Sequence, residues 1–99
     1  MTIKMRLNKD IKEFITRYVE ENFSDSKAFL FGSRTDDNKK GGDIDVLILS
    51  EEKLSFSDIS KMRISFYKIF GEQKIDLVNF TYSEETPFKK IALSQAIEL

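Results

Sequence analysis

Two segments decide the fold of this chain: FGS at residues 31–33 and GDIDVLIL at residues 42–49. The first ends an apolar run with a Gly-Ser turn. The second opens another apolar run with two carboxylates, Asp43 and Asp45, that a single residue separates. Because residues i and i+2 of a strand project to the same face, these carboxylates are predicted to stand side by side. Adjacent carboxylates repel each other unless a cation lies between them, and Mg²⁺ prefers such oxygen ligands together with substrate phosphates.

The turn between the two runs fits the same interpretation. Gly32 permits a tight turn and a close backbone approach. Ser33 adds a hydroxyl at the expected start of a short helical turn, where free backbone N–H groups attract anions. Arg34 supplies positive charge nearby. The sequence therefore predicts a cradle for a triphosphate beside the metal site.

A third carboxylate completes the predicted site. Residues 74–80 form another short apolar run, and Asp76 is its only acid. If this run forms a strand beside residues 43–49, Asp76 reaches the same metal ions. Three carboxylates around two Mg²⁺ ions suit an in-line displacement at phosphorus, because one ion stabilises the leaving pyrophosphate and the other activates the attacking hydroxyl.

With these residues in place, the chain resembles the DNA polymerase β-type nucleotidyltransferase superfamily, and its length resembles the minimal nucleotidyltransferase (MNT) branch. The resemblance rests on the Gly32-Ser33 pair, on Asp43-x-Asp45 and on Asp76. It implies that the Gly-Ser pair holds the nucleoside triphosphate and that the first two Asp residues bind two Mg²⁺ ions. The third Asp then helps to activate the acceptor hydroxyl.

The resemblance also implies a partner and a reaction. MNT proteins of this kind pair with a small all-helical HEPN-class protein in toxin–antitoxin systems, where the transferase is the antitoxin. The expected reaction moves AMP from ATP to a tyrosine hydroxyl of the toxin within a hetero-oligomer. Two alternatives remain open: an antitoxin that neutralises its partner by binding without catalysis, and a transferase that acts on a small molecule such as an antibiotic.

Each feature alone has an ordinary structural explanation, since acidic residues at strand ends are commonly solvated and Gly-Ser pairs are commonly turns. Two competing motifs fail on the sequence itself. A calcium-binding EF-hand loop starting at Asp36 would need a Glu at its twelfth position, which is Leu47. A phosphate-binding P-loop would need Gly-Lys-Ser/Thr after Gly32, and the chain has none there.

Composition narrows the function further. The 99 residues carry a net charge of −1, which argues against an extended nucleic-acid surface. The chain has no Cys and no His, so disulfides, a structural zinc site and a His base are excluded. No apolar run approaches the length of a membrane span, and no signal peptide is evident. These features predict one small domain over residues 1–99, without a membrane segment and located in the cytoplasm. The resemblance implies that it is a single minimal nucleotidyltransferase domain.

The periodicity of apolar residues predicts an α/β fold, a small mixed β-sheet packed with helices. The expected strands are residues 27–31, 43–49 and 75–80. The first helix begins at Asn8 or Lys9, and the second is capped by Ser55 or Ser57 and ends at Gly71. The side chains of the second helix expected to point inward are Phe56, Ile59, Met62, Phe66, Ile69 and Phe70.

The last helix is predicted to begin with Thr86 as N-cap and Pro87 at its first position. Its apolar spacing predicts that it continues to Leu99 at the end of the chain. Lys89 and Lys90 on this helix are expected to be solvated, with a position near the acceptor as the alternative.

Overall fold

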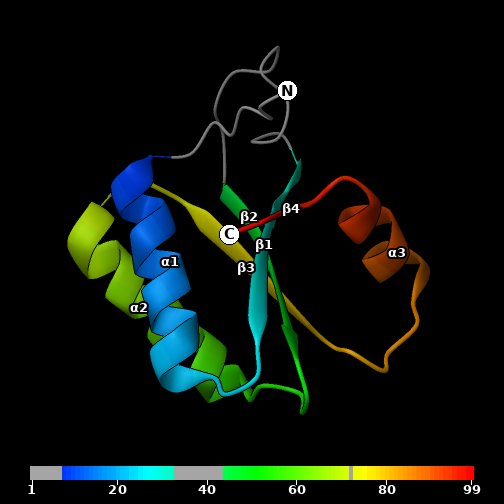
Figure 1. Cartoon of the computed structure of the whole chain (residues 1–99). Coiled ribbons are helices and arrows are strands. Elements are labelled where there is room, and N and C mark those ends of the chain that lie inside the picture. Colours follow the sequence, from blue (N-terminus) through cyan, green and yellow to red (C-terminus); the bar gives the residue numbers. More distant parts are fainter. Residues whose placement is uncertain (1–7, 33–43, 72) are drawn as a thin grey trace.

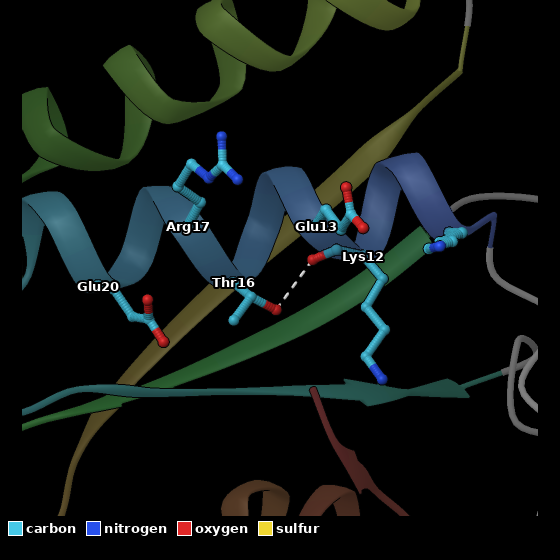
Figure 2. A pocket seen from close by; sticks show the side chains of 6 residues that line it. Lys12, Glu13, Thr16, Arg17 and Glu20 are labelled. Carbon is cyan, nitrogen blue, oxygen red and sulfur yellow. Dashed lines mark hydrogen bonds between the residues drawn. The ribbon is translucent and has the colours of Figure 1, made fainter.

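The computed structural model describes residues 8–32, 44–71 and 73–99, and it has three layers (Figure 1). Helices α1 and α2 cover one face of a four-stranded mixed sheet, and α3 lies on the other. The strand order is β3-β2-β1-β4, with β2 and β3 parallel and the other pairs antiparallel. The predicted fold class is therefore confirmed. The elements are α1 Lys9–Asn22, β1 Lys27–Phe31, β2 Ile44–Ser50, α2 Phe56–Phe70, β3 Ile75–Thr81, α3 Pro87–Ser94 and β4 Ile97–Glu98.

Side-chain caps fix where the helices begin. The Asn8 side chain accepts a hydrogen bond from the backbone N–H of Asp10, so Asn8 caps α1. Ser55 caps α2 in a reciprocal capping box with Asp58. Thr86 caps α3 as predicted, with Pro87 at its first turn. None of the helices in the described ranges has the length and apolarity that crossing a membrane requires.

The strand alternation of β2 divides the core into two clusters. Ile44, Val46 and Ile48 point toward α1 and α2, where they pack with Ile15, Met62 and Phe66 among others. Leu47 and Leu49 point to the opposite face, where they pack with Ala92 of α3. The period of two along a strand produces this division, and it also places Asp45 on the α3 face.

The predicted inward face of α2 is too wide. Met62 and Phe66 are fully buried and Ile59 and Phe70 are partly buried, but Phe56 is 85% exposed and Ile69 is 63% exposed. These two side chains lie on the flanks of the buried stripe. A helix that lies on a flat sheet buries only its central stripe, and apolar residues on its flanks remain in contact with water.

The prediction that the last helix extends to Leu99 is wrong. Helix α3 ends at Ser94, and Ile97–Glu98 form β4, which pairs with β1 opposite Leu30 and Phe29. The Leu99 N–H donates to the carbonyl of Ala28 at 2.9 Å. Strand β1 would otherwise present unpaired backbone groups at this edge, and pairing them outweighs continuation of the helix.

The expectation that Lys89 is solvated is also wrong, whereas Lys90 is exposed as expected. The Lys89 ammonium is buried and donates to the carbonyls of Thr81 (3.0 Å), Tyr82 (2.9 Å) and Glu84 (2.6 Å). An ammonium has three donors, so these carbonyls satisfy all of them. Lys89 thereby ties the start of α3 to the end of β3.

The same connection holds an ion pair. The Lys53 ammonium lies 3.1 Å from Glu84 Oε1, and the Thr81 N–H donates to the same carboxylate. The hydrogen bond from Thr81, followed by that from Lys53, lowers the pKa of Glu84 below its ordinary value.

Candidate functional site

Asp45 and Asp76 lie opposite each other on neighbouring parallel strands. The register of β2 and β3 pairs Asp45 with Asp76, one residue after Ile44 pairs with Ile75. Neighbouring strands are about 4.8 Å apart, so the two carboxylates project side by side from one face of the sheet. This is the α3 face, since Asp45 alternates with the buried residues Ile44 and Val46 of the other core. Asp45 is half-buried and Asp76 is exposed.

Gly32 lies beside Asp45 on the side away from Asp76, because β1 and β3 flank β2 on opposite sides. It follows Phe31, which pairs with Asp45 in the antiparallel register of β1 and β2. Gly32 has φ +76°, a conformation that favours glycine. A Cβ atom at this position would overlap Asp45 Oδ2 and lie 3.1 Å from Asp45 Cγ. The carboxylate therefore occupies the space that a side chain would need.

The described residues bring together three of the six predicted site residues: Gly32, Asp45 and Asp76. The other three, Ser33, Arg34 and Asp43, lie outside the described residues. Within the described ranges no cluster of three or more potential metal ligands occurs. Asp45 and Asp76 nevertheless fit a divalent cation by their chemistry, because adjacent carboxylates are the hard oxygen ligands that Mg²⁺ prefers.

The sequence pattern did not predict an aromatic cluster on the face of the sheet that carries the carboxylates. The Phe88 ring at the start of α3 packs against Phe31 at 6.1 Å and Phe80 at 6.0 Å between centroids. The available signal was the alternation of the strands, which places Phe31 on the same face as Asp45 once their register is known. The sequence alone did not give that register, nor the position of α3 over this face.

Comparison with protein families identifies the chain. The profile described as polymerase beta nucleotidyltransferase matches residues 13–99, a range that includes Gly32 and both described carboxylates. This chain belongs to the polymerase beta nucleotidyltransferase family. The fold agrees, since the mixed sheet carries the acids at the ends of adjacent strands. Comparison with curated protein sequences gives no match to this nucleotidyltransferase domain.

Solved structures of toxin–antitoxin complexes share the fold of this nucleotidyltransferase domain. One is a tri-AMPylated Shewanella oneidensis HEPN toxin in complex with MNT antitoxin, with 18% identity over 93% of this chain and 71% of that chain, at a TM-score of 0.69. A second, a toxin–antitoxin with AMP-PNP, shows 19% identity over 88% of this chain and 70% of that chain, at a TM-score of 0.72. A third, the MntA–HepT toxin–antitoxin, shows 17% identity over 92% of this chain and 70% of that chain, at a TM-score of 0.68. At these identities the similarity concerns the fold.

Proposed function

We propose that this domain is a Mg²⁺-dependent adenylyltransferase that moves AMP from ATP to a hydroxyl of a HEPN-class partner protein, and that it acts as an antitoxin. The observation that carries the proposal is the pairing of Asp45 with Asp76 across parallel strands, with Gly32 pressed against Asp45. Family membership supports the reaction class. The partner class is supported by the fold shared with chains of HEPN toxin–antitoxin complexes.

Each residue then has a distinct role. The backbone at Gly32 and the Ser33 hydroxyl bind the β- and γ-phosphates, with Arg34 contributing charge. Asp43, Asp45 and Asp76 would hold two Mg²⁺ ions, which would supply positive charge against the charge that develops on the phosphates. The acceptor oxygen forms a bond to the α-phosphorus, the bond from that phosphorus to the β-phosphate oxygen breaks, and pyrophosphate leaves. Asp76 assists deprotonation of the acceptor hydroxyl by receiving its proton.

A protein partner is consistent with the exposed apolar side chains. Ile64 and Tyr67 are both exposed on α2, and their spacing of three residues places them on one flank of the helix. Apolar residues gathered on a surface mark sites of protein association. This flank lies across the sheet from the carboxylates, so it supports a contact with a partner protein but does not itself position the acceptor hydroxyl.

The test uses the purified protein with its HEPN-class partner, Mg²⁺ and ATP labelled either in the α- or in the γ-phosphate. Label from the α-position, and none from the γ-position, is expected on the partner. Asp45→Asn and Asp76→Asn should each lower the rate by on the order of a thousandfold, because a metal-binding carboxylate contributes several kcal/mol to transition-state stabilisation.

Asp25→Asn is the matched control, since Asp25 is exposed and lies before β1, at the opposite end of the strand from Gly32. Its φ of +56° is one that Asn adopts readily. Transfer by the Asp25→Asn protein should equal that of the wild type. Wild-type transfer by Asp45→Asn contradicts the assigned site. Neutralisation of the partner without any labelling favours an antitoxin that acts by binding alone.

A further inference from the structure

Phe88 presents an aromatic ring to solvent on the face of the sheet that carries Asp45 and Asp76. Its side chain is 52% exposed even though two rings hold it, Phe31 edge-on and Phe80 at a tilt of 37°. The two supporting rings come from strands on either side of β2, so Phe88 spans the sheet face that carries Asp45. Its orientation is therefore set before any ligand arrives.

The path from Phe88 to Asp45 is short. Phe31 pairs with Asp45, and the Cβ atoms of such cross-strand pairs are about 5 Å apart. The Phe88 ring stands one side chain further along, with 6.1 Å between its centroid and that of Phe31. A nucleotide whose α-phosphate lies at Asp45 therefore has its base within reach of Phe88, because a single ribose joins the two.

The anchoring of α3 keeps this ring in place. The neighbouring Lys89 is fastened by its hydrogen bonds to Thr81, Tyr82 and Glu84, and Ala92 is buried against the sheet one turn later. These contacts fix the helix that carries Phe88, and Phe31 and Phe80 hold the ring. A rigid exposed ring binds a flat ligand without the entropy cost of ordering a mobile side chain.

We propose that Phe88 is the platform on which the base of the bound nucleoside triphosphate stacks, an inference that rests on the proposed function. Stacking on an aromatic ring contributes about 1–3 kcal/mol per base and accepts any base, since every base has a π-face. Phe88 therefore adds affinity for nucleosides over bare phosphates and does not choose between ATP and GTP. Ile91 is a neighbour on the same helix and is 66% exposed, but its aliphatic side chain offers no planar surface for stacking.

The experiment compares two ligands that share a triphosphate, Mg·ATP and Mg·tripolyphosphate, by calorimetric titration of the whole protein. Phe88→Ala is expected to weaken ATP about 5- to 150-fold, the range that base stacking spans, and to leave tripolyphosphate unchanged. Phe88→Leu keeps an apolar side chain against Phe31 and Phe80, and it should weaken ATP similarly. Phe88→Trp should retain the affinity, and GTP should respond as ATP does.

Phe56→Ala is the matched control, because Phe56 is also an exposed phenylalanine near the start of a helix but lies on α2, on the other side of the sheet. It should bind both ligands as the wild type does. Equal ATP affinity in Phe88→Ala and wild type overturns the platform while leaving the proposed function intact. Loss of both ligands in Phe88→Leu assigns the residue to folding of the site and overturns it as well. If the wild type binds neither ligand with Mg²⁺, the proposed function fails too.

Discussion

At the scale of single residues, position 32 is the part of the site that tolerates substitution least. Two requirements meet there: a positive φ and the absence of a Cβ that would overlap the Asp45 carboxylate. Gly32→Ala is expected to lower stability by about 1–3 kcal/mol through backbone strain and also to displace Asp45. We expect Mg²⁺-dependent nucleotidyl transfer to fall in addition, measured beside denaturant unfolding of the same protein.

Gly71 separates the two effects. Its φ is +64°, yet a Cβ there would meet no atom within 4 Å. Gly71→Ala should therefore suffer the strain without disturbing the carboxylate, and its transfer rate should match the wild type under conditions where it is folded. Equal rates for the two alanine variants would show that the approach of Gly32 to Asp45 has no catalytic consequence.

The site illustrates what a pattern of residues can and cannot predict. The spacing of Asp43-x-Asp45 and the isolated acid Asp76 indicate carboxylates at strand ends, and the structure brings Asp45 and Asp76 together. Phe88 could not be found in this way. Its proximity to Phe31 depends on how α3 crosses the sheet, which follows from tertiary packing rather than from local spacing.

At the scale of elements, α3 depends on a buried charge. Lys89→Met leaves the carbonyls of Thr81, Tyr82 and Glu84 without their donor while filling similar space. We expect a loss of about 2 kcal/mol in the free energy of unfolding, measured in urea, because unsatisfied acceptors outweigh the gain from removing a buried ammonium. The exposed neighbour provides a matched control, since Lys90→Met should stay within about 0.5 kcal/mol of the wild type. Equal stability of the two methionine variants would mean that water satisfies these carbonyls just as well.

Local signals predicted where the elements begin better than where they end. The caps are Asn8, Ser55 and Thr86, each of which accepts a hydrogen bond with its own side chain, so the residue type alone indicates the cap. The end of α3 is different, since a favourable helical pattern continues past Ser94. Residues 97–98 instead pair with β1, a strand more than sixty residues earlier in the chain. A local sequence pattern does not reveal that this edge of the sheet is open for pairing.

At the scale of the whole molecule, the two faces of the sheet are unequal. Helices of 14 and 15 residues cover one face over the larger core, and an 8-residue helix covers part of the other. The carboxylates lie on the thinly covered face, which leaves them open to the nucleotide and acceptor of the proposed reaction. The sequence predicted the α/β class, but this division depends on the strand register, which sets which residues of β2 face which layer.

This asymmetry predicts that α3 opens without unfolding of the rest. Native-state hydrogen exchange should give α3 amides a lower opening free energy and a smaller dependence on denaturant than the amides of β2 and α2. The reason is that Ala92 is the only apolar side chain of α3 in the buried core, whereas α2 contributes Met62 and Phe66 to the larger one. Should α3 and β2 amides share one free energy and one slope, the domain opens only as a unit. If the base of bound ATP stacks on Phe88, Mg·ATP should raise the exchange protection of the α3 amides toward that of the β2 amides. Occupancy of the site would then stabilise the least stable layer of the fold.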